Sequence, residues 1–280
     1  MATRSHISRR LFLTATAGAV VTGAGVAGYL SGVLPGVGGA EPKFKTFDSS
    51  ARGKPVTYGW ATPPDHEPDG LPVVLVLHGR GDDAHSAFDS LAAHEFLAQH
   101  VANGGAPVGI ASVDGGETYW HPRADGDDPL AMISGELLPR LGEIGFDTGR
   151  LSLLGYSMGG FGALMLAREA SNGRFGAPGQ LVAAAASSPA LFARASVTSA
   201  GSFDDAEDFE RWGDLAADPD VGDLPLSVSC GADDPFRAET ERYCKACDPA
   251  PAGSLGEGGH DHGYWRSLLP DQLVFLSERS

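Results

Sequence analysis

Cysteine is scarce in this chain of 280 residues, which contains only Cys230, Cys244 and Cys247. A small scaffold held together by many disulfides is therefore excluded. One bridge could form, between Cys244 and Cys247 or between Cys230 and either of them, and the odd count would leave one free thiol. A redox role for the Cys-x-x-Cys pair is not favoured, because no thioredoxin-like strand-helix-strand context surrounds it. A zinc site is not favoured either, because no further ligands stand at suitable spacing. We expect a structural pair or free thiols, and no metal.

Positive charge is also in short supply. Lysine and arginine together number 20 against 36 aspartates and glutamates, which gives a formal net charge of −16. A surface this acidic repels nucleic acid and anionic lipid. We therefore expect no nucleic-acid partner, whereas the charge itself says nothing about the fold.

Charged residues are absent from residues 11–40, which are rich in glycine, alanine and threonine. Directly before this stretch stand Arg9 and Arg10, and an arginine pair before an apolar stretch resembles a twin-arginine export signal. Small residues at 38–40 suit a signal peptidase, with Glu41 opening the mature chain. We predict export to the cell envelope or the medium, with residues 1–40 as the signal peptide. Loss of its three arginines would move the net charge from −16 to −19.

An uncleaved membrane anchor is the alternative interpretation of residues 11–40, since the stretch is long enough to span a bilayer. Its many glycines weaken membrane retention, so we favour cleavage. In that case the chain contacts a membrane only if the signal segment is retained. No cysteine lies near the cleavage position, which argues against a lipoprotein.

Residues 41–280 are long enough for one large domain with a sizeable core. We expect strands at residues 43–47, 56–61, 71–77, 108–113, 150–154, 181–186, 224–229 and 253–257, and helices at residues 84–101, 130–141, 158–170, 237–247 and 264–276. The apolar run at 71–77 is typical of a strand buried on both faces. Strands that alternate with helices predict an α/β fold, with a mostly parallel central sheet covered by helices on both faces.

Residues 191–222 break this alternation. They are acidic, with a run of Asp and Glu at 204–208, and they also hold Phe203, Phe209 and Trp212. Because they lie between two expected strands, they could form a small lid, or they could be a solvated surface excursion. A calcium site is not favoured, since the spacing of the carboxylates fits no EF-hand loop.

The run Gly-Tyr-Ser-Met-Gly-Gly at residues 155–160 is the clearest candidate for a reactive group. A strand is expected before it and a helix after it, so Ser157 would sit at the tip of a sharp turn. Such a turn needs small residues on either side, and Gly155 and Gly159 supply them. At the helix N-terminus, backbone N–H groups and the helix dipole favour a developing negative charge. We predict that Ser157 is a nucleophile.

A serine hydroxyl becomes a good nucleophile when a histidine accepts its proton and a carboxylate orients that histidine. On this kind of sheet the acid and then the base follow the serine along the chain. Only His260 and His262 follow Ser157. We favour His260 as the base, because the two glycines before it allow a tight turn after the last expected strand.

The acid is expected in the segment Cys-Gly-Ala-Asp-Asp-Pro-Phe at residues 230–236, directly after a strand. We favour Asp234 over Asp233, because the Gly-x-x-Asp-Pro pattern places Asp234 at a turn and Pro235 fixes the backbone beyond it. Aspartate is also common in turns for local reasons, so Asp233 stays open as an alternative.

Two backbone N–H groups should converge on the substrate oxygen as an oxyanion hole. One is expected from Met158, the residue after the nucleophile. The other is expected from the loop His-Gly-Arg-Gly-Asp-Asp at residues 78–83, which follows an early strand. We favour the N–H of Arg80 and place Gly81 second.

A second loop, residues 115–122, follows the expected strand at 108–113. Ligands gather beyond the carboxyl ends of such strands. Together with the histidine of the first loop, this gives four candidate pocket residues, although the aromatic ones could equally pack in the core: His78, Tyr119, Trp120 and His121.

These motifs together resemble the α/β-hydrolase superfamily, and more narrowly the esterase D and mycolyltransferase-like family of esterases. The resemblance spans roughly residues 43–278 and rests on four segments: Gly-x-Ser-Met-x-Gly (155–160), His-Gly-Arg-Gly-Asp-Asp (78–83), Ser-Pro-Ala-Leu (188–191) and Gly-Gly-His-Asp with Tyr-Trp (258–265). It implies an α/β-hydrolase fold with Ser157, Asp234 and His260 as a catalytic triad. His78 before Gly79 is an esterase-like trait that departs from secreted mycolyltransferases.

We therefore expect a secreted serine esterase that acts through an acyl-enzyme on a small-molecule, lipid or polysaccharide ester, with no metal or organic cofactor. Two alternatives remain at this point. An acyltransferase would use the same residues with a hydroxyl compound in place of water. A catalytically silent cell-envelope binding protein could share the fold. The sequence does not predict an oligomeric state.

Overall fold

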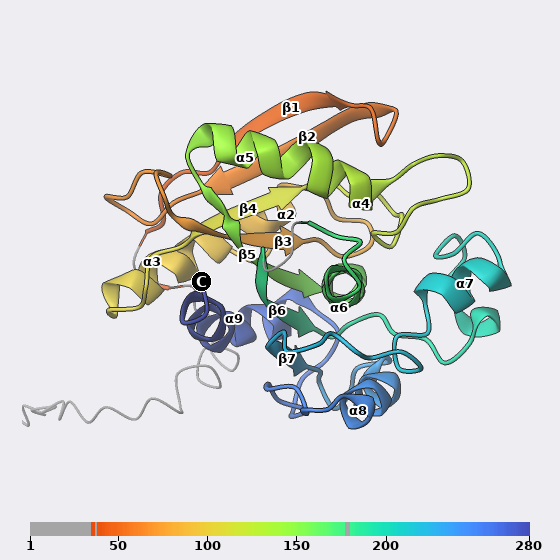
Figure 1. Cartoon of the computed structure of the whole chain (residues 1–280). Coiled ribbons are helices and arrows are strands. Elements are labelled where there is room, and N and C mark those ends of the chain that lie inside the picture. Colours follow the sequence, from red (N-terminus) through yellow and green to blue (C-terminus); the bar gives the residue numbers. More distant parts are fainter. Residues whose placement is uncertain (1–34, 37, 177–179) are drawn as a thin grey trace, which may run out of the picture.

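A seven-stranded sheet forms the centre of the structure, a computed structural model that describes residues 35–36, 38–176 and 180–280. The strand order is β1-β2-β4-β3-β5-β6-β7, antiparallel across β1, β2 and β4 and parallel from β4 to β7 (Figure 1). The strands are β1 (Lys43–Ser49), β2 (Lys54–Ala61), β3 (Pro72–Leu77), β4 (Gly109–Val113), β5 (Asp147–Tyr156), β6 (Leu181–Ser187) and β7 (Leu226–Ser229). The predicted mostly parallel α/β sheet is confirmed.

Helical segments connect the strands and cover the sheet. They are α2 (Ser86–Asp89), α3 (Ala93–Ala102), α4 (Pro129–Ala131), the π-helical η1 (Met132–Leu137), α5 (Leu138–Ile144), α6 (Met158–Ser171), the 3-10 turn η2 (Ala195–Val197), α7 (Ala206–Trp212), α8 (Arg237–Ala246) and α9 (His262–Ser277).

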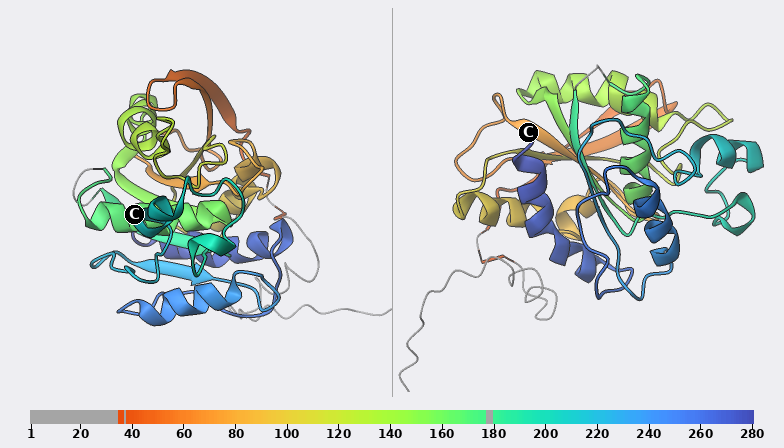
Figure 2. Two further views of the ribbon diagram at one scale, coloured as in Figure 1. Left: turned by 90° about the vertical axis from the view of Figure 1, so that its right-hand side faces the viewer. Right: turned by 60° about the horizontal axis from the view of Figure 1, so that its bottom comes forward.

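Strand β3 shows why the parallel strands lie at the centre. Its side chains alternate between two cores: Val73, Leu75 and Leu77 face one, whereas Val74 and Val76 face the other. Helices α5 and α6 cover the first core, and α3 and α9 cover the second (Figures 1 and 2). A strand with two apolar faces must be covered on both sides, which produces the layered α/β arrangement.

The register of the parallel strands brings four loops to one edge of the sheet. Leu77 pairs with Gly155, Tyr156 pairs with Ser187, and Ser187 pairs with Ser229. The strands β3, β5, β6 and β7 therefore end side by side. The loops that follow them carry the candidate oxyanion residue, the nucleophile and the candidate acid, as expected for this kind of sheet.

Two expected elements are wrong. The helix predicted at residues 84–101 is split into α2 and α3, because Ala92 adopts a left-handed backbone with φ of 54°. The strand predicted at 253–257 is absent among the described residues, where a single bridge between Ser227 and Ala252 joins this segment to β7. Gly253, with φ of 106°, leaves the extended conformation directly after this bridge, so the pairing does not continue as a strand.

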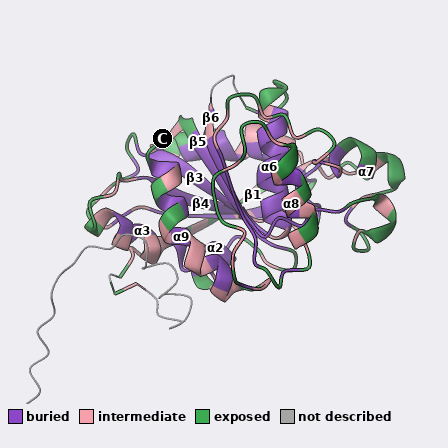
Figure 3. Cartoon of the chain, turned by 90° about the horizontal axis from the view of Figure 1, so that it is seen from below, coloured by how far each residue is buried: buried purple, intermediate pink, exposed green. Residues whose placement is uncertain are grey.

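Residues 191–222, which we call the cap segment, leave the sheet between β6 and β7 and contain η2 and α7. Figure 1 shows α7 projecting from the body of the molecule, and Figure 3 shows that much of its surface is exposed. The expected excursion is therefore present, and its action as a lid stays a prediction.

The predicted signal peptide, residues 1–40, lies outside the described residues except at 35–36 and 38–40. In the described part of the chain, we find no helix with the length and apolar character needed to cross a membrane.

Candidate active site

Ser157 occupies the one-residue turn between β5 and α6. Its backbone angles, φ 55° and ψ −120°, lie outside the regions that L-residues favour. The surroundings hold it there: its N–H donates to Ser187 O at 3.0 Å, and its carbonyl accepts from Ala190 N at 2.9 Å. Strain maintained by neighbouring contacts is common at functional sites, because it presents a side chain in a fixed direction.

The glycines around Ser157 are required by close backbone approach. A Cβ placed on Gly155 would stand 2.0 Å from the carbonyl oxygen of Gly159. A Cβ placed on Gly159 would stand 1.9 Å from the carbonyl oxygen of Leu77, the last residue of β3. The turn can therefore bend this sharply, and lie this close to the loop after β3, only without side chains at these positions.

Ser157, His260 and Asp234 form one hydrogen-bonded chain. Ser157 Oγ lies 2.9 Å from His260 Nε2, and His260 Nδ1 lies 2.8 Å from Asp234 Oδ2. A carboxylate can only accept, so Nδ1 carries the proton and Nε2 is left to accept the serine proton. The Asp234 side chain is fully buried, whereas His260 is 24% exposed and can be reached from solvent. The three predicted residues are thus within the distances that serine activation requires.

The environment keeps Asp234 ionised. Burial alone would raise its pKa, but hydrogen bonds from His260 and from the N–H of Phe236, 2.8 Å from Oδ1, hold the pKa below its usual value. Asp233 is exposed, and its N–H donates to Gly258 O at 3.0 Å. Its backbone ties the acid loop to the histidine loop, while its side chain lies outside the hydrogen-bonded chain.

Two aromatic side chains that lie within the predicted motifs, but had no predicted role, flank His260. The ring centre of Phe236 lies 5.2 Å from that of His260, and the Trp265 ring lies 5.0 Å away and edge-on. Phe236 follows Pro235 in the acid loop, and Trp265 lies on the first turn of α9. These two residues could have been predicted near the site, because they adjoin the predicted acid and base in segments that lie at the same edge of the sheet.

His262, the alternative base, points elsewhere. Its Nε2 lies 3.3 Å from Asp82 Oδ2 in the loop after β3. The same carboxylate oxygen accepts a hydrogen bond of 2.7 Å from the hydroxyl of Tyr156. His262 is therefore adjacent to the triad but bonded to a different carboxylate.

The loop after β3 lies against the nucleophile turn. A Cβ on Gly79 would stand 2.9 Å from the Tyr156 ring and 3.4 Å from the Cβ of Ser157. The loop then turns, with Asp82 N–H donating to Gly79 O at 3.3 Å. Arg80 lies within this turn, and Met158 opens α6, whose first N–H groups have no partner inside the helix. Both predicted oxyanion donors therefore belong to segments that border Ser157, and their role stays a prediction.

The side chain of His78 lies beneath this loop and contacts the backbone of two loops. It is 2% exposed, its Nδ1 lies 2.7 Å from Gly79 O, and its Nε2 accepts from Gly115 N–H at 2.9 Å. Burial lowers its pKa, which agrees with a neutral ring that donates at Nδ1 and accepts at Nε2. Buried Arg52 fixes the partner loop by donating to the carbonyls of Asp114 and Gly115. His78 therefore lies beneath the surface, where it connects two loops.

The other three predicted pocket residues are also buried, at 2% exposure or less: Tyr119, Trp120 and His121. The ring of His121 stacks between Phe203 and Trp212 of the cap segment, at centroid distances of 5.1 and 5.9 Å. Tyr119 and His121 therefore pack the cap segment against the body, whereas Trp120 packs against His78. Direct contact with a substrate stays a prediction.

Polar contacts fasten the cap segment at two further points. Arg123 donates to Asp204 Oδ1 at 2.7 Å and to Ser202 O at 2.8 Å. Arg80 donates from its Nη2 to Ala200 O at 2.8 Å. The candidate oxyanion loop is thus bonded directly to the cap segment.

All three cysteines are free thiols in this structure, so none of the possible pairings is formed. Burial raises the pKa of Cys230 to about 12 and that of Cys244 to about 11. Thiols with such pKa values carry almost no thiolate near neutral pH and are weak nucleophiles and ligands. Within the described residues, no cluster of histidine, cysteine and carboxylate groups could hold a metal ion.

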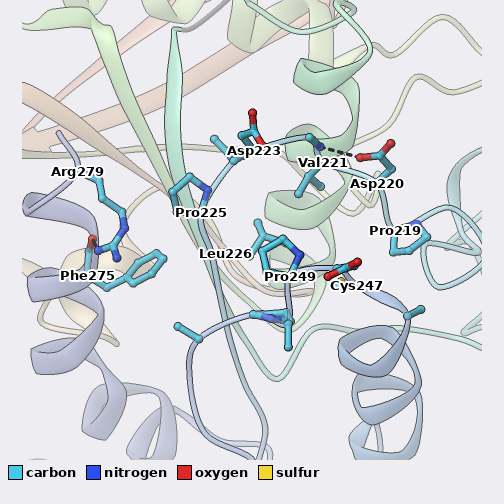
Figure 4. Close-up of a pocket in the computed structure, with 17 residues that line it drawn as sticks. Pro219, Asp220, Val221, Asp223, Pro225, Leu226, Cys247, Pro249, Phe275 and Arg279 are labelled. Atoms are coloured by element: carbon cyan, nitrogen blue, oxygen red, sulfur yellow. Dashed lines mark hydrogen bonds between the residues drawn. The ribbon is translucent and has the colours of Figure 1, made fainter.

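The cavity drawn in Figure 4, of about 530 Å³, lies away from the triad. It is bordered by Pro225 and Leu226 at the beginning of β7 and by Pro249 and Arg279. Asp234 follows the other end of the same strand, so this cavity and the triad lie at opposite edges of the sheet.

Three solved structures illustrate the similarity of the fold. For a ferulic acid esterase, the TM-score is 0.70 at 19% sequence identity, and the match covers 85% of this chain and 97% of the esterase chain. An S-formylglutathione hydrolase from Agrobacterium tumefaciens has a TM-score of 0.66 at 17% identity, with coverage of 88% and 98%. The fluorophosphonate-binding serine hydrolase F of Staphylococcus aureus has a TM-score of 0.65 at 16% identity, with coverage of 86% and 99%.

Identities this low establish the fold alone, which is that of the α/β-hydrolase esterases. No curated protein matches the chain. The sequence model of one family, described as "Putative esterase", matches residues 49–276. This match begins at the last residue of β1 and includes all the other strands and the three triad residues. The chain therefore belongs to this esterase family.

Proposed function

We propose that this protein is an exported serine esterase that hydrolyses carboxylic esters through an acyl-enzyme. The observation that carries the proposal is the chain of two hydrogen bonds from Ser157 through His260 to Asp234, at 2.9 and 2.8 Å. Membership of the esterase family and the esterase folds of its structural neighbours support an ester hydrolase.

In the first half of the proposed reaction, Ser157 Oγ attacks the ester carbonyl carbon while its proton passes to His260 Nε2. The carbonyl π electrons move to the oxygen, and the N–H groups of Met158 and Arg80 stabilise the resulting oxyanion. The carbonyl then re-forms and the ester C–O bond breaks. The leaving alkoxide takes the proton from His260 and departs as the alcohol, leaving an acyl group on Ser157.

In the second half, a water molecule gives a proton to His260 Nε2 as its oxygen attacks the acyl carbon. The bond to Ser157 Oγ breaks, and the serine recovers its proton from His260. The products are a carboxylic acid and the free enzyme, so no redox partner or organic cofactor is consumed. Asp234 remains ionised throughout and stabilises the imidazolium that forms twice in the cycle.

Export through the twin-arginine route is part of the proposal and rests on Arg9, Arg10 and the uncharged residues 11–40. Expression with Arg9 and Arg10 both changed to lysine should retain the protein inside the cell, while the natural sequence should yield a mature chain beginning near Glu41. Mass spectrometry of the extracellular and envelope fractions measures both. An unprocessed chain in the membrane fraction would favour the uncleaved anchor.

The activity is tested with p-nitrophenyl esters of increasing acyl length and with methyl ferulate, since one structural neighbour is a ferulic acid esterase. We expect turnover by the natural protein and none by Ser157→Ala. Turnover that rises when an alcohol acceptor is added, with ester as product, would favour the acyltransferase. A folded protein with no turnover and no labelling by a fluorophosphonate would favour the silent binding protein.

A further inference from the structure

Three segments far apart in the chain meet at one oxygen atom next to the triad. Asp82 Oδ2 accepts from the Tyr156 hydroxyl at 2.7 Å and from His262 Nε2 at 3.3 Å. Asp82 belongs to the loop after β3, Tyr156 is the last residue of β5, and His262 is the first residue of α9. The reaction scheme uses none of these three side chains.

Each contact leads directly to a component of the proposed machinery. Asp82 closes the turn that contains Arg80, through its N–H bond to Gly79 O. Tyr156 immediately precedes the nucleophile. His262 is two residues beyond the triad histidine, and both histidine rings lie edge-on to Trp265, at 5.0 Å for His260 and 4.9 Å for His262.

The contact with Tyr156 is well shielded. Tyr156 is 1% exposed, its ring lies 4.7 Å from the Trp265 ring, and its other contacts include the backbone at Gly79. Burial raises the pKa of Tyr156, and the Asp82 carboxylate raises it further, so the hydroxyl keeps its proton and remains a donor. A hydrogen bond to an ionised acceptor at a shielded position is stronger and more directional than one between exposed neutral groups.

We propose that Asp82 is a positioning residue, which fixes the oxyanion loop against both the nucleophile strand and the histidine loop through Tyr156 and His262. The inference rests on the proposed esterase function. Its physical basis is that oxyanion donors act only when held within a fraction of an ångström of their productive positions. Arg80 lies in an exposed turn, and the bonds of Asp82 to Tyr156 and His262 fix the end of that turn.

The first test compares Asp82→Ala with Asp82→Asn, using p-nitrophenyl acetate as the probe. The alanine variant should lower kcat by about tenfold to hundredfold while KM changes much less, because the loss falls on the transition state. The asparagine variant should recover most of kcat, since its amide oxygen still accepts from Tyr156 and His262. Tyr156→Phe, which removes one of the two bonds, should give an intermediate loss.

Asp147→Ala is the matched control. Asp147 is also a partly exposed carboxylate, paired with Arg150 at 2.6 Å, but it begins β5 at the opposite edge of the sheet from Tyr156. This control should leave kcat unchanged. Thermal unfolding of all variants separates positioning from folding, because a positioning role lowers kcat without a matching fall in Tm.

Different results would overturn the inference and the function on which it rests. Asp82→Ala with natural kcat, or a kcat loss that asparagine does not restore and that follows Tm, would overturn the inference while leaving the esterase intact. Natural protein that neither hydrolyses the ester nor reacts with a fluorophosphonate would overturn both. The labelling rate gives an independent measure, and it should fall in Asp82→Ala in parallel with kcat.

Discussion

His78 accepts a hydrogen bond of 2.9 Å from the backbone N–H of Gly115, and this contact joins the loop after β3 to the loop after β4. The acceptor is the ring nitrogen that protonation would occupy. Since Nδ1 already faces Gly79 O at 2.7 Å, an added proton on Nε2 would replace the contact with Gly115 by two donors facing one another. The loop that carries Arg80 thus depends on a neutral histidine.

This relationship predicts that the protein loses stability in mild acid. Burial lowers the pKa of His78, His100 and His121 below the ordinary 6.5. As pH falls through about 6.5, the unfolded chain binds protons at these positions and the folded chain does not. Their contribution is complete above pH 6.5 and is lost as pH falls towards the folded-state values. We expect a decrease in unfolding free energy of up to about 1.4 kcal/mol per pH unit for each histidine.

Urea unfolding at about pH 7.5, 6.5 and 5.5 measures the slope. His78→Gln cannot titrate and should reduce the pH dependence by about one proton, whereas His85→Gln on the exposed surface should leave it unchanged. A flat stability curve between these pH values would show that the folded chain binds these protons as readily as the unfolded chain.

The two neighbouring aspartates of the acid loop should differ sharply. Asp234→Asn replaces the acceptor of the His260 proton, so the imidazole loses its favoured tautomer, and kcat should fall by about four orders of magnitude. Asp233→Asn changes an exposed side chain and should leave kcat close to that of the natural protein. Steady-state hydrolysis of one p-nitrophenyl ester measures both. A greater loss in Asp233→Asn would reassign the acid.

Gly159→Ala should destabilise the fold, because its methyl group would stand 1.9 Å from Leu77 O and neither backbone segment can yield. We expect a loss of more than about 3 kcal/mol or no soluble protein. Gly135→Ala is the matched control: Gly135 lies in η1 with no atom within 4 Å of the added Cβ. It should stabilise the protein by up to about 1 kcal/mol. Thermal unfolding of both variants distinguishes close approach from a general effect of glycine.

The arrangement of the sheet and the order of the triad follow from local signals in the sequence. The apolar run at 71–77 predicts a central strand, because a strand with two apolar faces must be buried on both sides. The glycines on either side of Ser157 predict a tight turn, because such a turn leaves no room for side chains. The choice of Asp234 over Asp233 also had a local cause, the turn fixed by Pro235. Distances of 2.9 and 2.8 Å then join positions that the chain separates by up to 103 residues.

Contacts that depend on the meeting of distant loops left no such signal. Nothing in the residues around Asp82 indicates that Tyr156 and His262 would share its Oδ2. His121 is a predicted pocket residue because it follows a strand, and that role stays a prediction, but the sequence did not indicate that Phe203 and Trp212 of the cap segment would stack on its ring. The cap segment covers the His121 ring, and its sequence has no regular hydrophobic periodicity from which this packing could be predicted.

The side chain of Arg80 links the loop after β3 to the cap segment. Arg80→Met retains the backbone N–H proposed for the oxyanion hole but removes the donor to Ala200 O, 2.8 Å away. The cap segment should loosen at residues 199–203, so we expect KM to rise more than kcat falls. Hydrogen exchange of that segment provides a second readout. Glu117→Gln, the control, removes only the negative charge of the exposed group that accepts from Arg80 Nε, and exposed ion pairs contribute little. If Arg80→Met lowered kcat at constant KM, the side chain would act on the oxyanion loop itself, and the cap segment would not depend on it.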